Sequence, residues 1–109
     1  MASFNVINAY NYRPGGVSSL LNITAAAVVK ATAGCLFRVT VVTAGSGGSL
    51  TINDNNATGG TNTAANTILT VPNASLTQGT VLWYAWPCIT GITISAVPTG
   101  SPVFAVSYG

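Results

Sequence analysis

Glutamate and histidine are absent from this chain of 109 residues, whose charged side chains are three basic ones, Arg13, Lys30 and Arg38, and one acidic one, Asp54. Soluble domains carry a charge on about one residue in four. A single carboxylate side chain and no imidazole exclude a pair of catalytic carboxylates, a Ser-His-Asp triad and a thiol activated by histidine. We therefore expect the protein not to be an enzyme, and we assign no catalytic residue and no cofactor.

Metal-binding patterns and clusters of basic residues are also missing. Cys35 and Cys88 form neither a CxxC nor a Cys–His pattern, so we expect no metal site. Around Asp54 the sequence Asn-Asp-Asn-Asn provides one carboxylate for calcium, and an Asn/Asp turn explains the same residues better. The net charge of +2 is too small for a nucleic-acid-binding surface, so nucleic acid is not an expected partner.

Long apolar runs and an export signal are missing as well. Ala25–Val29 is far shorter than the roughly 20 residues that cross a bilayer, so no membrane association is expected. The opening MASFNVINAYNYRPGG lacks the basic start and apolar stretch of a secretory signal. We expect a cytosolic product in which Cys35 and Cys88 are two small buried thiols rather than one disulfide.

Short β-branched runs alternate with Gly-, Pro- and Asn-rich turns from residue 23 to residue 109. This pattern predicts an all-β fold, a single compact β-sandwich or jelly-roll-like domain of about seven or eight short strands. In one strand, strict alternation places Phe37, Val39 and Val41 on one face and Arg38 and Thr40 on the other. The expected strands are Ala25–Ala31, Cys35–Thr43, Ser49–Asn53, Thr67–Val71, Thr80–Trp86, Ile89–Val97 and Val103–Tyr108.

Residues 1–22 have a different composition, with asparagines among aromatic residues and a Pro-Gly-Gly break. We interpret them as an extended N-terminal arm attached to the domain formed by residues 23–109. A chain with so little charge is poorly protected against self-association, so a homo-oligomer is expected. The candidate interface residues of the arm are Phe4, Tyr10, Tyr12 and Arg13.

Three aromatic residues, Trp83, Tyr84 and Trp86, stand close together in one expected strand. Alternation puts Trp83 on the opposite face from Tyr84 and Trp86, so a continuous platform for a sugar ring does not follow automatically from their closeness in sequence. Core packing or a protein interface is the favoured interpretation, because Tyr and Trp are enriched at interfaces.

The strands and turns follow a recurring plan: a strand with Lys, a Gly turn, a Val/Thr-rich strand, a polar loop, a Thr-Gly turn and a terminal Val-Ser-Tyr strand. The plan is carried by AVVKATAGCLFRVTVVTAGSGGSLTIND, AANTILTVPNASLTQGTV, WPCITGITISAV and GSPVFAVSYG. These stretches, which cover roughly Ala25–Gly109, resemble small all-β structural proteins of tailed bacteriophages and prophages.

The resemblance implies a virion component, with the role of a capsid decoration or cement protein. Such a protein would lie on the capsid exterior, bind the major capsid protein across subunit junctions, and be assembled in the bacterial host cytoplasm as a homo-oligomer, with a trimer favoured. The resemblance supplies no catalytic residues. Alternatives are a glycan- or receptor-binding head-fibre or tail module, or another virion component such as a tail or head-completion protein.

Overall fold

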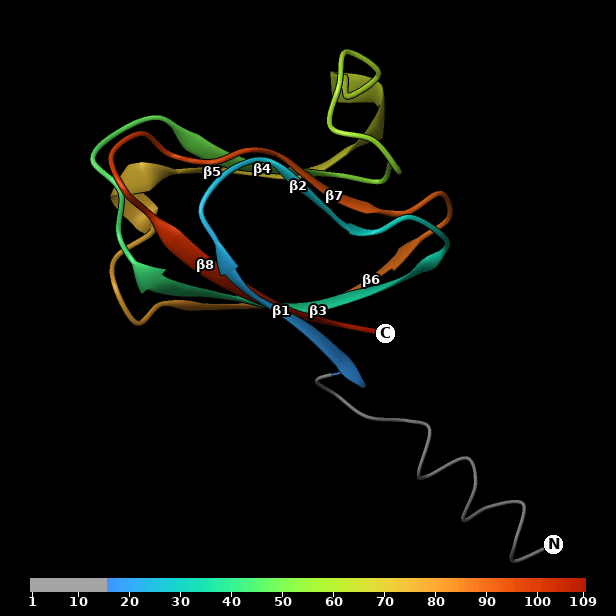
Figure 1. Ribbon diagram of the computed structural model, residues 1–109, viewed down its shortest axis with the longest axis horizontal. Coiled ribbons are helices and arrows are strands. Elements are labelled where there is room, and N and C mark those ends of the chain that lie inside the picture. The colour runs from blue at the N-terminus through green and yellow to red at the C-terminus, as the bar shows by residue number, and fades with distance from the viewer. Residues whose placement is uncertain (1–15) are drawn as a thin grey trace, which may run out of the picture.

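Two four-stranded antiparallel sheets make up the computed structural model, which describes residues 16–109 (Figure 1). One sheet has the strand order β1-β8-β3-β6 and the other β2-β7-β4-β5. The described part of the chain is therefore all-β, as the sequence predicts. The strands are β1 (Ser18–Ile23), β2 (Ala27–Lys30), β3 (Gly34–Thr43), β4 (Ser49–Asn53), β5 (Thr67–Pro72), β6 (Val81–Cys88), β7 (Ile92–Ala96) and β8 (Val103–Tyr108), with short 3₁₀ turns η1 (Ala64–Asn66) and η2 (Asn73–Ser75).

The strands pair as if one long hairpin were folded over on itself. Strand β1 pairs with β8, β2 with β7, β3 with β6, and β4 with β5. Further pairing of β3 with β8 and of β4 with β7 completes the two sheets. The chain changes sheet at every connection except the one between β4 and β5. Strands from distant parts of the sequence consequently become direct neighbours.

The core lies between the two sheets and is aliphatic, with one buried phenylalanine. Most of the buried strand residues are Val, Ile, Leu or Phe, whose side chains fit a pleated, half-buried surface. Burying each such side chain contributes about 1.5–3 kcal/mol relative to leaving it exposed. The fully buried residues include Leu36, Val39, Val41, Phe104 and Val106 from one sheet, and Leu50, Ile52, Ile92 and Ile94 from the other.

The first strand differs from the sequence-based expectation. Residues 18–22, which we assigned to the arm, belong to β1 and pair with β8, where Ser18 lies opposite Tyr108. An extra residue between Leu20 and Ile23, together with the positive φ of 56° at Asn22, interrupts the alternation that would have revealed this strand. The candidate interface residues Phe4, Tyr10, Tyr12 and Arg13 lie outside the described residues.

Strand β3 follows the expected alternation only in its second half. Val39 and Val41 face the core as predicted, but Leu36, not Phe37, is their buried partner toward the start of the strand. Relative to β8, β3 carries one extra residue between Leu36 and Arg38, which is a β-bulge. The bulge leaves Phe37 half-buried and keeps Arg38 on the outward face.

Candidate functional site

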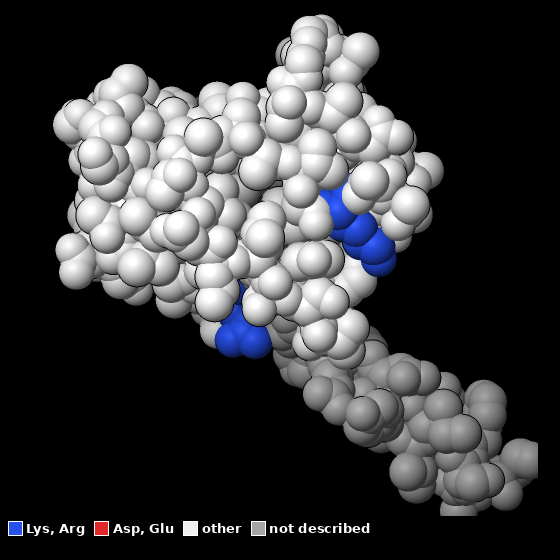
Figure 2. Space-filling view, in the orientation of Figure 1, with Lys and Arg blue, Asp and Glu red and all other residues white. Residues whose placement is uncertain are grey.

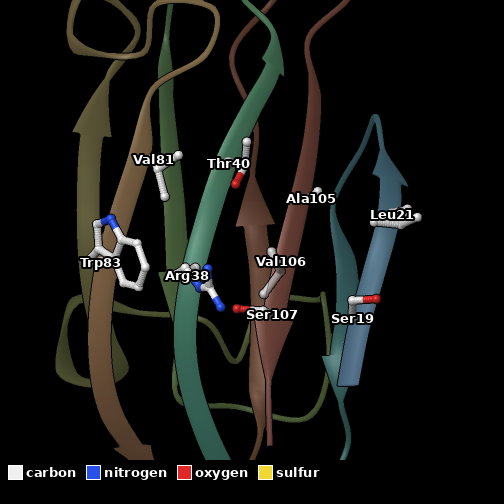
Figure 3. A pocket seen from close by; sticks show the side chains of 9 residues that line it. All are labelled: Ser19, Leu21, Arg38, Thr40, Val81, Trp83, Ala105, Val106 and Ser107. Atoms are coloured by element: carbon white, nitrogen blue, oxygen red, sulfur yellow. The ribbon is translucent and has the colours of Figure 1, made fainter. Parts of the chain in front are cut away.

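The side of the β1-β8-β3-β6 sheet that faces away from the core, here called the outer face, carries a shallow hollow. Two rows of side chains cross the four strands (Figure 3). Arg38 of β3 lies between Trp83 of β6 and Ser107 of β8, because it is paired in register with both. These two rows border a hollow of about 270 Å³, which is lined by Ser19, Leu21, Arg38, Thr40, Val81, Trp83, Ala105, Val106 and Ser107. We call this the Arg38 hollow.

Large apolar side chains surround the Arg38 hollow and remain open to solvent. Trp83 is 62% exposed and Leu21 is 67% exposed, and both line the hollow. Val81, which is 40% exposed, lies on the same strand as Trp83. Single exposed apolar residues are ordinary, but several of them on one sheet face make this face a candidate for contact with another molecule.

Arg38 is the one charged residue among those that line the hollow. Its guanidinium carbon lies 4.5 Å from the centre of the Trp83 ring, a cation–π contact worth about 0.5–1 kcal/mol at an exposed site. The Nε atom of Arg38 is buried and has no hydrogen-bond partner among residues 16–109, and the same is true of Ser107 Oγ. A buried polar atom without a partner costs about 1–3 kcal/mol. The hollow thus presents two hydrogen-bonding atoms that nothing in the described part of the chain satisfies.

A second hollow lies at the open edge between the two sheets, beside Trp86. Trp86 is paired with Leu36 and therefore faces inward, but β6 is an edge strand, so the ring is 50% exposed. This hollow, of about 370 Å³, is called the Trp86 groove and is lined by Asp54, Ala65, Asn66, Thr67, Ile68, Trp86, Ile89 and Thr90. Trp83 and Trp86 thus line separate hollows, which confirms that they form no continuous platform.

The carboxylate of Asp54 is bound to the turn between β6 and β7. It accepts backbone hydrogen bonds from Ile89 at 3.0 Å, from Thr90 at 2.8 Å and from Gly91 at 3.2 Å. Burial acts to raise the pKa of Asp54, but the three N–H donors outweigh it, so the pKa lies below its usual value. Within residues 16–109, no cluster of three or more His, Cys, Asp or Glu side chains is placed to hold a metal ion. In the structure, Asp54 therefore stabilises the turn at residues 89–91.

The Asn-rich loop around residues 53–66 is held together by its own side chains. Asn53, only 1% exposed, donates from Nδ2 to Asn66 Oδ1 at 2.7 Å and to Thr63 O at 3.2 Å. Asn62 Nδ2 donates to Gly59 O at 2.9 Å and to Ala57 O at 2.7 Å. These bonds hold the η1 turn next to the Trp86 groove.

The two cysteines lie on neighbouring strands as free thiols in the described structure. Cys35 pairs in register with Pro87, and Cys88 pairs with Gly34. Cys88 is buried and Cys35 is half-buried. Burial, together with the nearby Asp54 and Cys35, raises the pKa of the Cys88 thiol to about 11. At neutral pH this thiol is protonated and behaves as a small apolar side chain.

The basic residues of the described surface, Lys30 and Arg38, lie apart from each other, on a face that shows no acidic side chain (Figure 2). Lys30 Nζ donates to Gly109 O at 3.1 Å. Arg38, by contrast, lines the Arg38 hollow. No helix in residues 16–109 has the length and apolar character needed to span a membrane.

Comparison of the chain with protein-family models, with curated proteins and with solved structures finds no match. The residues of the chain therefore carry the functional argument. Sequence alternation placed Arg38 and Thr40 on one face of their strand and Trp83 on the face opposite Tyr84 and Trp86, but it did not indicate the Arg38 hollow. What it lacked was the strand order that brings Ser19, Arg38, Trp83 and Ser107 together.

Proposed function

We propose that the protein is a structural protein of a bacteriophage virion, which decorates the outside of the capsid and stabilises the head as a cement protein. The observation that supports the proposal is the apolar outer face, on which Trp83 and Leu21 are exposed. The described part of the chain carries only three charged side chains, those of Lys30, Arg38 and Asp54. A surface of this kind adheres to protein and is a poor match for nucleic acid or for a charged substrate.

As part of the same proposal, we assign the all-β fold more specifically to the β-sandwiches of the jelly-roll type. The strand orders β1-β8-β3-β6 and β2-β7-β4-β5, with the first strand paired to the last, support this assignment. Jelly rolls occur in viral capsid proteins and in lectins. The fold agrees with the proposed role without fixing it, because one fold serves many functions.

In this proposal the partner is the major capsid protein, and the protein acts as a homo-oligomer, with a trimer favoured. The resemblance of residues 25–109 to small phage structural proteins supports the location on the capsid exterior, after assembly in the host cytoplasm. Many copies of a modest contact, each joining neighbouring capsid subunits, give durable attachment through avidity. The arm residues Phe4, Tyr10, Tyr12 and Arg13 remain candidates for contact with the capsid or with another subunit.

A second candidate function, a glycan- or receptor-binding head-fibre or tail module, is favoured by the Trp86 groove. There an exposed indole ring lies beside the polar side chains of Asn66, Thr67 and Thr90, a combination that can stack on a sugar and hydrogen-bond its hydroxyl groups. Another virion role, in the tail or in head completion, is the third alternative.

Copy number in purified particles tests the proposal. Virions from the phage or prophage that encodes the protein are separated by electrophoresis, and the protein is quantified against the major capsid protein. A capsid decoration role predicts a copy number of the same order as that of the major capsid protein, and labelled antibody over the whole head. A few copies confined to the tail or to one vertex would contradict decoration and favour the alternatives.

A further inference from the structure

We propose that the Arg38 hollow binds an aspartate or glutamate side chain presented by a protein partner. Under the proposed function, on which the identity of this partner rests, that partner is the major capsid protein. The inference names a site and a ligand chemistry on the sheet face, separate from the arm residues that the sequence suggests for contact.

The first argument is that the chain itself has no acidic side chain to offer. Asp54 is its single acidic residue, and both carboxylate oxygens of Asp54 already accept backbone hydrogen bonds from residues 89–91. The same fact argues against an acidic side chain of a second copy as the occupant, because that side chain would again be Asp54. An acidic side chain that pairs with Arg38 would therefore come from a different protein.

The second argument is the placement of the unsatisfied atoms. Ser107 lies directly opposite Arg38 in the β3–β8 ladder, and Figure 3 shows the Arg38 side chain directed toward it. Arg38 Nε and Ser107 Oγ are both buried without a partner in the described structure. A carboxylate has two oxygens that accept from such donors, and charge-assisted bonds to a guanidinium are roughly twice as strong as neutral ones. Because both atoms are buried, the Arg38 and Ser107 side chains must turn toward the hollow for one carboxylate to satisfy both.

The third argument is the apolar wall around these atoms. Leu21, Val81 and Trp83 present hydrocarbon to whatever enters the hollow. A protein segment can cover this hydrocarbon and exclude water, which strengthens a pair between Arg38 and a carboxylate and shields it from salt. An acidic sugar fits less well, because Arg38 already covers one face of the Trp83 ring, on which a sugar would stack.

The test uses the full-length ¹⁵N-labelled protein in low-salt buffer, titrated with N-acetyl-glutamate N-methylamide and, in parallel, with the neutral N-acetyl-glutamine N-methylamide. We expect the Arg38 Nε–H and Trp83 indole N–H resonances to shift and saturate with the acidic probe only. Arg38→Gln abolishes the response, Ser107→Ala weakens it several-fold, and Lys30→Gln, which removes the other described cation, leaves it unchanged.

Four results would overturn the inference. They are the absence of a saturating shift, an equal response to the neutral probe, a response to methyl glucuronide in place of the glutamate probe, and dissociation of a wild-type oligomer on Arg38→Gln. The first two remove the carboxylate site, the third assigns the hollow to a glycan, and the fourth assigns it to a second copy of the chain.

Virion purification separates this inference from the proposed function. If folded Arg38→Gln protein still decorates particles as the wild type does, the inference is wrong and decoration stands. If the wild-type protein is missing from heads but binds the acidic probe selectively, the decoration role is wrong and the carboxylate site stands. The result expected if both hold is at least a tenfold loss of head occupancy for Arg38→Gln and none for Lys30→Gln.

Discussion

Arg38 and Trp83 lie opposite each other in the β3–β6 ladder, with the guanidinium carbon 4.5 Å from the centre of the indole ring. The stack orients a cation and a large apolar ring on an open sheet face, where neither gains much from burial within the chain. Trp83 keeps 62% of its surface exposed, and Arg38 Nε finds no partner in the described residues. Under the proposed contact, a partner that covers this face would bury the ring and provide an acceptor for Arg38.

The two tryptophans give the first prediction, because they separate the two candidate functions. Trp83→Ala removes apolar surface from the outer face and should lower occupancy on virions at least tenfold. It should cost only about 0.5–1 kcal/mol of unfolding free energy, the value of the exposed cation–π contact. Trp86→Ala is the matched control and should leave occupancy unchanged. Particle sedimentation and thermal denaturation of each variant provide the measurements.

The reverse result would favour the glycan-binding alternative. In that case Trp86→Ala would abolish binding on a glycan array while Trp83→Ala would not. Loss of array binding in Trp86→Ala, with full virion occupancy in Trp83→Ala, would contradict the decoration role of the outer face.

Local alternation predicts the strands well where it is unbroken. The expected strands Ser49–Asn53 and Val103–Tyr108 coincide with β4 and β8, because each has a regular inward set flanked by turn residues. Strand β1 escaped prediction because Asn22, with its positive φ, and an extra residue break the period. The same kind of irregularity in β3 is the reason why Leu36, and not the expected Phe37, faces the core.

The Arg38 hollow could not be predicted, for a different reason. Its residues come from positions between Ser19 and Ser107, and only the pairing of β1 with β8 and of β3 with both β8 and β6 joins them. Strand order depends on long-range packing, and neither propensity nor local pattern encodes it. The low charge of the chain did predict a surface suited to association, but not which face.

The second prediction concerns Asp54 and the turn that it holds. Asp54→Asn removes the charge and one of the accepting oxygens, so we expect a loss of about 1–3 kcal/mol of unfolding free energy. Asn56→Ala, in the same loop but exposed, is the control and should change stability little. Urea denaturation measures both variants. Equal stability of Asp54→Asn and the wild type would show that the carboxylate does not hold the turn.

The same carboxylate sets the acid limit of the fold. The pKa of Asp54 is lowered in the folded state, so the unfolded chain takes up the proton first as the pH falls. Its contribution is complete above the unfolded pKa of about 3.9 and disappears as the pH falls through the folded pKa. The unfolding free energy of the wild type should therefore decrease as the pH is lowered from about 4. The Asp54→Asn variant should not show this decrease.

The third prediction concerns the order of thiol reactivity. Burial raises the pKa of both thiols, that of Cys88 to about 11, and Cys88 is the more buried. In the folded protein at pH 8, iodoacetamide should modify Cys35 slowly, and Cys88 only after denaturation. Mass spectrometry of tryptic peptides measures both rates. Faster labelling of Cys88 than of Cys35 would contradict the burial, and no labelling of unreduced, unfolded protein would indicate a disulfide.

The fourth prediction tests the arm against the sheet face. Removing residues 1–15, which include Phe4, Tyr10, Tyr12 and Arg13, should leave the fold intact, because the described pairing with β8 keeps its bond from Val17 N to Tyr108 O and all of strand β1. Under the proposed function the truncated protein should keep the circular dichroism and unfolding temperature of the wild type but fail to attach to virions. Full attachment of the truncated protein would remove the arm from the interface and leave the outer face as the contact surface.

The last prediction returns to the shortage of charge. Salt screens exposed charges strongly, with a Debye length of about 10 Å at 0.1 M and about 3 Å at 1 M, but acts much less on buried pairs. If attachment depends on the apolar outer face and on one shielded pair at Arg38, occupancy on virions should stay nearly constant over that range of sodium chloride. Arg38→Gln should lower occupancy by a similar factor at every salt concentration, because the pair that it removes is protected from solvent. Occupancy after sedimentation at each concentration gives the measurement. Release of the wild-type protein by salt alone would mean that solvent-exposed ion pairs hold it, which a chain with three basic side chains and one acidic side chain can scarcely provide.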